Sequence, residues 1–171
     1  MDVVVVGVGG GGLISGIAAA LKESRPGVRV YGVEPERSNA MSLALAAGTI
    51  VRLQPASIAD GLGAPFAGEW TLAMTQRYVD DVVLIDDATI LGGLRFALER
   101  TKQVLEPAGA AALAALLYGR IKLRAGDRVA VVLRGCESFG EGIPMEDRRS
   151  YDSAHGRAVR SPARRRPSCR A

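Results

Sequence analysis

The sequence contains very few cysteine, histidine and aromatic residues. Its 171 residues include two cysteines and one histidine, and aromatic side chains make up 5% of the chain although 48% of it is hydrophobic. The low aromatic content predicts an aliphatic core in an α/β domain, and no disulfide is expected in a cytosolic protein. No apolar run is long enough to cross a membrane, and the valines after Met1-Asp2 lack the positive segment that begins a signal peptide. We therefore expect a cytoplasmic location and no membrane partner.

The excess of positive charge is confined to the last part of the chain. The net charge is +4, but residues 1–133 hold 13 basic and 13 acidic side chains, whereas residues 134–171 hold nine arginines and five acids. The composition therefore changes near residue 134. We expect a domain over 1–133 and, over 134–171, a basic tail that is either disordered or translated in a shifted frame. A nucleic-acid-binding fragment driven by the tail is an alternative, but the neutral body favours no nucleic-acid partner.

Glycine is concentrated in one stretch near the N-terminus, VVVVGVGGGGL, at residues 3–13. The four valines predict a short buried strand, and from Leu13 the apolar residues recur at helical spacing. A glycine loop between a strand and a helix lets backbone amides approach a ligand closely, because glycine has no Cβ and a helix N-terminus carries unpaired N–H groups. The stretch therefore predicts a phosphate-binding loop.

Two cofactors fit this loop. The pattern G-x-G-x-x-G over residues 7–12, with Glu34 22 positions later, matches the dinucleotide fingerprint and predicts an NAD-type site in which the acid binds a ribose. As four consecutive glycines before an apolar residue, residues 9–12 resemble the tetraglycine loop of the fold-type II pyridoxal-phosphate enzymes, which binds the phosphate of the cofactor. The loop alone does not decide between them.

Strand and helix patterns alternate along the chain. Strands are expected at residues 3–6, 28–33, 82–85 and 128–133, and helices at 13–22, 38–47, 66–78, 86–102 and 111–118. This alternation predicts an α/β fold with a doubly wound, mostly parallel sheet. Residues 106–110 are expected to form a break. One face of the helix at 86–102 is expected to be apolar and buried through five residues: Ile90, Leu91, Leu94, Leu98 and Val104.

Six motifs in a fixed order resemble the C-terminal portion of the threonine dehydratase and serine racemase family. They are VVVVGVGGGGLISGI, VYGVEPE, SIADGL, VDDVVLIDD, LEPAGAAALAAL and VAVVL, and they cover about residues 2–133. The dinucleotide interpretation does not account for SIADGL or LEPAGA, so pyridoxal 5'-phosphate is the favoured cofactor and NAD the alternative. The resemblance implies part of the large domain of a fold-type II enzyme, similar to the tryptophan synthase β chain.

The resemblance also implies roles for individual residues. Glu106 would lie near the cofactor ring, and Asp60 and Gly61 would line the substrate side of the pocket. The residues that would hold the cofactor phosphate share one loop: Gly9, Gly10, Gly11, Gly12 and the amide of Leu13.

Glu34 matches a carboxylate that binds a cation in some relatives of this family. The carbonyl ligand of that site falls at Ser38, but the second carboxylate falls at Ala40, which cannot ligate a metal. A metal site at Glu34 is therefore a weak expectation. A solvated acid at the end of a strand is the other interpretation of this residue.

The residues that carry the covalent chemistry of the family have no counterpart here. Relatives form a Schiff base with a lysine upstream of the tetraglycine loop, whereas the lysines of this chain, Lys22, Lys102 and Lys122, have none of that sequence context. Arg134 replaces a serine that contacts the ring nitrogen; an arginine accepts no hydrogen bond and would disfavour protonation of that nitrogen. We expect no catalytic residue in this chain and no activity from it alone.

The resemblance implies a pyridoxal-phosphate-dependent threonine/serine ammonia-lyase. Such an enzyme removes the α-proton and the β-hydroxyl of a small hydroxy amino acid, threonine or serine, and releases a 2-oxo acid and ammonia. The parent enzyme would be a cytoplasmic homo-oligomer of amino-acid metabolism, with isoleucine biosynthesis as the expected pathway. A serine racemase or another β-hydroxy amino acid lyase is the alternative within the family, and an NAD-type dinucleotide-binding domain is the alternative from another class.

Overall fold

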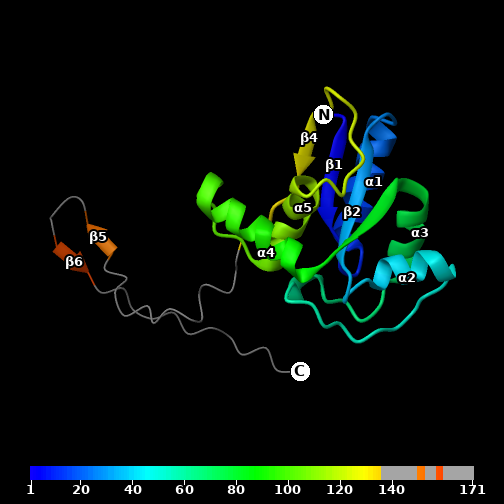
Figure 1. Ribbon diagram of the computed structural model, residues 1–171, viewed down its shortest axis with the longest axis horizontal. Helices are drawn as coiled ribbons and strands as arrows, with labels where there is room; N and C mark the ends of the chain where they lie inside the picture. The colour runs from blue at the N-terminus through cyan, green and yellow to red at the C-terminus, as the bar shows by residue number, and fades with distance from the viewer. Residues whose placement is uncertain (136–149, 153–156, 160–171) are drawn as a thin grey trace. The chain divides into compact units, whose positions relative to one another are not determined.

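The computed structural model describes residues 1–135, 150–152 and 157–159 (Figure 1). Internal contacts divide the chain into two units, Met1–Cys136 and Glu137–Ala171. Each unit is described by itself, and the candidate functional residues of the sequence all lie in the first.

The second unit contains one short antiparallel pair of strands. Here β5 (Ser150–Asp152) pairs with β6 (Arg157–Val159). The assignment of residues 134–171 to a basic tail stays a prediction. Three residues noted in the sequence lie outside the described residues: Cys136, His155 and Cys169.

Four parallel strands form the sheet of the first unit. They lie in the order β3-β2-β1-β4, and all three pairings are parallel. Parallel neighbours need crossover connections, which the helices supply. The α/β class and the doubly wound parallel sheet are therefore confirmed. The strands are β1 (Val3–Gly7), β2 (Arg29–Pro35), β3 (Asp81–Ile85) and β4 (Val129–Val131).

The strand β1 is buried on both of its faces. Val3 and Val5 belong to one core cluster, whereas Val4 and Val6 belong to a second cluster on the opposite side of the sheet. A strand covered on both sides needs a continuous apolar run instead of an alternating one. The four valines therefore place β1 in the middle layer of the domain, and the loop that follows it begins at the carboxyl edge of the sheet.

Helices cover the two faces of the sheet (Figure 1). One face is covered by α1 (Gly12–Ser24), α2 (Ala40–Ala47) and α3 (Glu69–Tyr78). The other is covered by α4 (Asp87–Phe96), its π-helical continuation η2 (Ala97–Thr101) and α5 (Pro107–Leu117). A 3-10 turn, η1 (Asp60–Leu62), interrupts the long loop after α2. None of the helices in the described ranges is long and apolar enough to span a membrane.

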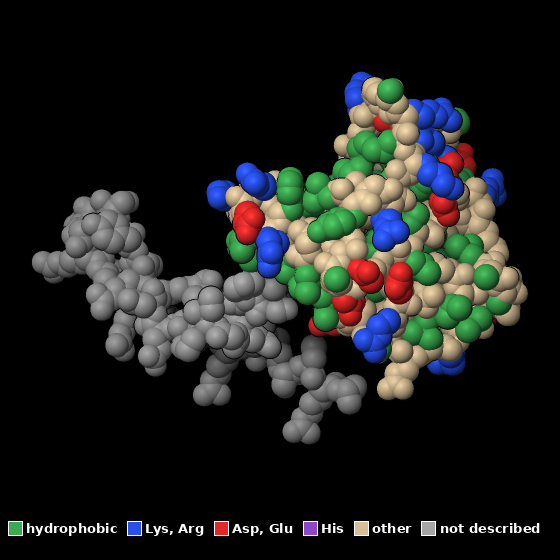
Figure 2. All heavy atoms as spheres, viewed as in Figure 1, with side chains coloured by type: hydrophobic (Ala, Val, Ile, Leu, Met, Phe, Trp, Pro, Cys, Tyr) green, Lys and Arg blue, Asp and Glu red, His purple; other side chains and the backbone are tan. Residues whose placement is uncertain are grey.

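The predicted buried face of α4 is partly wrong. Ile90 is fully buried, but Leu91 and Leu98 are 51% and 55% exposed, and Figure 2 shows hydrophobic side chains among charged ones on the surface of this region. The stripe that packs on α5 uses small residues instead, among them Gly93 and Ala97. The leucine spacing therefore predicted the wrong buried face of this helix, because a close contact between two helices favours small side chains over large ones.

The predicted break at residues 106–110 is also wrong, because α5 begins at Pro107. Proline is favoured at the first position of a helix, where its missing N–H would have no partner. Ala108 and Gly109 are both buried, so the first turn of α5 packs as tightly as its alanine-rich remainder. The Glu-Pro-Ala-Gly motif therefore starts a helix.

The contact of α4 with α5 gives a test of the fold. A Cβ on Gly93 would lie 2.6 Å from Cβ and 2.9 Å from Cα of Ala114. We expect Gly93→Ala to lower the free energy of unfolding by about 1–3 kcal/mol through overpacking. The matched control is Gly16→Ala on α1, where an added Cβ meets no atom within 4 Å. This control should gain up to about 1 kcal/mol of helix propensity. Equal denaturation midpoints for the two variants would contradict the helix contact.

Candidate cofactor site at the glycine loop

The glycine loop joins the end of β1 to the start of α1. Gly11 adopts a left-handed backbone conformation with φ of 90°, and a Cβ there would also lie 2.9 Å from Cβ of Thr71. The hydroxyl of Thr71 donates a hydrogen bond of 2.7 Å to the carbonyl of Gly10. The hydroxyl of Ser15 donates in turn to the carbonyl of Thr71 at 3.3 Å. The loop is therefore fixed against α3, and only glycine fits at position 11.

The amides of this loop are unpaired within the described part of the chain. No backbone or side-chain acceptor there takes the N–H groups of residues 9–13, and the first loop-to-helix bond is donated by Ser15 to Gly11 at 3.0 Å. Five successive donors therefore remain at the N-terminus of a 13-residue helix. Such a set of donors is suited to a phosphate, because the helix dipole and the N–H groups both favour negative charge.

These amides open into a cleft of about 160 Å³. Residues 7–14 line it on one side, and Gly61, Leu62 and Arg134 line it on the other. An added Cβ on Gly9 would lie 3.4–3.5 Å from the backbone of Leu62, so the two loops approach closely. The structure therefore brings together the glycine loop and the SIADGL loop.

Only one of the two residues predicted for the substrate side lines this cleft. Gly61 does so, and an added Cβ there would lie 2.9 Å from Cβ of Ala108 and 3.5 Å from Oε1 of Glu106. The carboxylate of Asp60 instead accepts a hydrogen bond of 2.8 Å from the amide of Gly61. Asp60 is exposed and is not part of the cleft lining. Its contact with substrate stays a prediction.

Glu106 lies beside the cleft at the start of α5. Its side chain is 15% exposed, and Oε1 lies 3.9 Å from Nη2 of Arg134. Arg134 was not predicted as a binding residue, although it follows the last strand at the carboxyl edge of a parallel sheet, where ligands bind in such folds. That position is the signal that could have identified it.

Glu34 is not solvated, in contrast to one interpretation of the sequence. It is fully buried, and its carboxylate accepts hydrogen bonds from the amides of Met41 and Ser42, both at 2.8 Å, and from the Ser42 hydroxyl at 2.6 Å. Burial raises the pKa of Glu34, whereas these hydrogen bonds lower it. Within the described ranges no cluster of three histidine, cysteine or acidic residues could hold a metal. The role that the structure gives Glu34 is to bind the start of α2, and its cation site stays a prediction.

The three lysines of the chain do not line the cleft. Lys22 pairs with Asp80 at 2.7 Å, and its position in α1 is about 15 Å along the helix axis from the glycine loop. The ammonium of Lys102 donates to the carbonyl of Glu99 at 2.8 Å. Lys122 is 86% exposed and lies near the carboxylate of Asp81. The expectation that none of them serves the cofactor stays a prediction.

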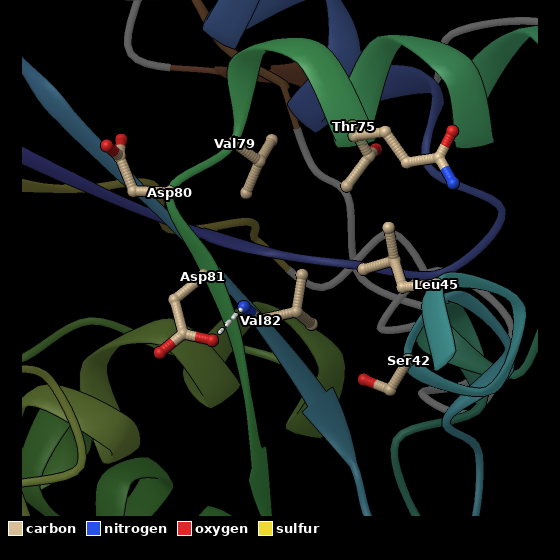
Figure 3. A pocket seen from close by; sticks show the side chains of 8 residues that line it. Ser42, Leu45, Thr75, Val79, Asp80, Asp81 and Val82 are labelled. Atoms are coloured by element: carbon tan, nitrogen blue, oxygen red, sulfur yellow. Dashed lines mark hydrogen bonds between the residues drawn. The ribbon is translucent and has the colours of Figure 1, made fainter. Parts of the chain in front are cut away.

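A larger cavity of about 420 Å³ lies between α2, α3 and the start of β3, away from the glycine loop (Figure 3). The hydroxyl of Thr75 is buried there without a hydrogen-bond partner among the described residues. The nearby carboxylates are already used, because Asp80 pairs with Lys22 and Asp81 accepts from the amide of Val82 at 2.9 Å. An anion would meet two acids in this cavity, so the glycine cleft is the better phosphate site.

Comparisons with known proteins show the family of the chain. A family model described as pyridoxal-phosphate dependent enzyme matches residues 1–135. An L-threo-3-hydroxyaspartate ammonia-lyase from a Pseudomonas species is 38% identical over 136 residues, which are 79% of this chain and 42% of the relative. The crystal structure of a T.th. threonine deaminase has a TM-score of 0.73 at 38% identity and covers 78% of this chain and 48% of that one. The structure of maize serine racemase has a TM-score of 0.73 at 35% identity, and the match covers 79% of this chain and 44% of the racemase chain. The chain thus spans less than half the length of each of these relatives.

The burial of Glu34 predicts a pH dependence of stability. Because the pKa of Glu34 in the folded chain lies above the ordinary value of 4.5, the unfolded chain releases this proton more readily. The free energy of unfolding should therefore fall as the pH rises from the ordinary value through the raised one. Urea titrations of the full chain over a pH series should show this decline, and Glu34→Gln should remove it.

Glu99→Gln is the matched control, because Glu99 is exposed on η2. This control should keep the decline of the original chain. A decline of the same size in Glu34→Gln would show that Glu34 titrates normally and would contradict the account.

Proposed function

This chain belongs to the pyridoxal-phosphate dependent enzymes, and we propose that it is the cofactor-phosphate-binding part of a threonine/serine ammonia-lyase. The observation that carries the proposal is the row of five amides at residues 9–13, which have no acceptor among the described residues and belong to residues that line a small cleft at the carboxyl edge of the sheet. The motifs of the sequence and the named relatives support the reaction class. The whole enzyme's substrate, threonine or serine, its homo-oligomeric state and its place in isoleucine biosynthesis are part of the proposal.

The residues of the cleft fit the phosphate of the cofactor. Each N–H group that binds a charged oxygen contributes about 1.5–3 kcal/mol, so three or four of the five amides suffice for firm binding. The left-handed Gly11 and the open space at Gly10 keep side chains out of the cleft. Glu106 and Gly61 would lie on the side of the ring and of the substrate. When it is bound, the cofactor supplies an electron sink for the carbanion that follows loss of the α-proton.

The NAD alternative is wrong for this chain. In that interpretation Glu34 would bind a ribose hydroxyl, but its carboxylate is fully buried and is already bound to two amides and a hydroxyl of α2. The family match over residues 1–135 is to pyridoxal-phosphate dependent enzymes. Serine racemase and other β-hydroxy amino acid lyases remain the alternatives within the family, and the maize serine racemase match favours keeping the first of them.

A phosphate-binding experiment tests the site. Pyridoxamine 5'-phosphate is the probe, because its amine needs no lysine, and isothermal titration of the full 171-residue chain gives its affinity. A methyl group on Gly10 meets nothing closer than Cβ of Ala64 at 3.9 Å, so Gly10→Ala should fold normally while its methyl occupies the cleft. We expect at least a tenfold loss of affinity, the equivalent of about one lost hydrogen bond to a charged oxygen.

The control for this experiment is Gly16→Ala, which changes the helix after the glycine loop, outside the cleft lining. It should bind the probe like the original chain, and pyridoxamine without phosphate should bind neither protein tightly. Equal affinities of Gly10→Ala and the original chain would overturn the assignment of the phosphate to the glycine loop.

The lysine positions predict the activity of the chain by itself. We propose that the 171-residue chain does not turn over threonine, because Lys22, Lys102 and Lys122 all lie outside the cleft lining. Assays for 2-oxobutanoate with added pyridoxal 5'-phosphate should therefore show no product above a reaction without protein. Turnover that borohydride abolishes would mean that one of these lysines does carry the cofactor.

A further inference from the structure

We propose that Arg134 is the charge-compensating cation of the glycine cleft: it offsets the carboxylate of Glu106 and makes the cleft selective for a dianionic phosphate monoester. The proposal deepens the proposed function and rests on it. This role of Arg134 differs from that of the serine which the resemblance implies at this position, because that serine contacts the ring nitrogen of the cofactor.

The position of Arg134 follows from the register of the sheet. Val5 of β1 pairs with Val131 of β4, and the amide of Val132 donates to the carbonyl of Val5 at 3.0 Å. Continued by three residues, this parallel register brings Arg134 level with Val8, beside the first glycines of the loop. Val8 and Arg134 both line the cleft, which agrees with that placement.

Two further contacts fix the backbone of Arg134. Leu105 and Gly135 form an isolated antiparallel bridge, which connects the chain after β4 to the residue before Glu106. An added Cβ on Gly109 would lie 2.9 Å from the carbonyl carbon and 3.1 Å from the amide nitrogen of Arg134. Glycine at 109 therefore lets the backbone of Arg134 lie directly against α5. The backbone position from which the Arg134 side chain extends is thus fixed.

The side chain of Arg134 keeps donors available for an anion. Its Nη2 lies 3.9 Å from Oε1 of Glu106, which is longer than the 2.7–2.9 Å or so of a charge-assisted hydrogen bond. This contact with Glu106 is the one that the described residues make with its guanidinium, and a guanidinium has five N–H donors. The side chain is 48% exposed, so a ligand can reach it.

The charges around the cleft explain why a cation is needed. Among the residues that the structure describes, Arg134 is the one charged residue in the cleft lining, and an added Cβ on Gly61 would lie 3.5 Å from Oε1 of Glu106, whose side chain is 15% exposed. Without Arg134, the largely buried carboxylate of Glu106 would repel a phosphate monoester in the cleft, because charges that are partly removed from water interact more strongly. Arg134 cancels this repulsion, and its planar fork suits phosphate oxygens.

The test is a double-mutant cycle on the full chain, with pyridoxamine 5'-phosphate and pyridoxamine as probes in isothermal titrations. Arg134→Gln should weaken binding of the phosphate probe at least tenfold, reduce the salt dependence of that binding, and leave pyridoxamine binding unchanged. Arg134→Lys keeps the charge and should keep most of the affinity. In Arg134→Gln combined with Glu106→Gln, the loss should be smaller than in Arg134→Gln alone, because no uncompensated carboxylate is left.

Arg100→Gln is the matched control, since Arg100 is exposed on η2, lies outside the cleft lining and changes the net charge equally. It should bind both probes like the original chain. Equal affinity of Arg134→Gln and the original chain for the phosphate probe, with Gly10→Ala still defective, would overturn the role of Arg134 and leave the proposed function intact. No binding of the phosphate probe by the original chain would overturn both.

Discussion

The absence of side chains at Gly9, Gly10 and Gly11, between β1 and α1, is the constraint on which the site depends. At Gly11 the left-handed backbone and the proximity of Met41 and Thr71 leave no room for a Cβ. The valines of β1, buried on both faces, hold the start of the loop, and the Thr71 hydroxyl holds the Gly10 carbonyl. The backbone carbonyl is therefore satisfied on the protein side, while the amides remain available to a ligand on the other.

The elements around this loop are held by polar groups that the ligand does not need to touch. Glu34 binds the first amides of α2, and α2 supplies the Met41 side chain that packs on the loop. Gly109 lets the backbone of Arg134 approach α5, which places a cation in the cleft lining and beside Glu106. The described lining of the cleft thus contains hydrogen-bond donors and one cation, with the Glu106 carboxylate beside that cation, an arrangement suited to a phosphate monoester.

The sequence was sufficient for the α/β class, the parallel strands and the glycine loop, because continuous valine runs and glycine clusters have few other uses. The sequence was insufficient where tertiary packing alone decides which of several similar residues is buried. The leucines of α4 have helical spacing, but the buried stripe runs through Gly93 and Ala97 since α5 approaches closely. Glu34 stood at a strand end like any solvated acid, and only the tertiary placement of α2 shows that it is buried. The pairing of Arg134 with Glu106 joins residues 28 positions apart and has no local signal.

The most direct test of the central claim is amide NMR of the ¹⁵N-labelled full chain during a titration with pyridoxamine 5'-phosphate. The account predicts saturable shifts of the amide signals of residues 9–13, where donors without acceptors face the cleft. Shifts confined to the neighbourhood of Thr75, in the larger cavity between α2 and α3, would contradict it, as would unchanged spectra at saturating probe.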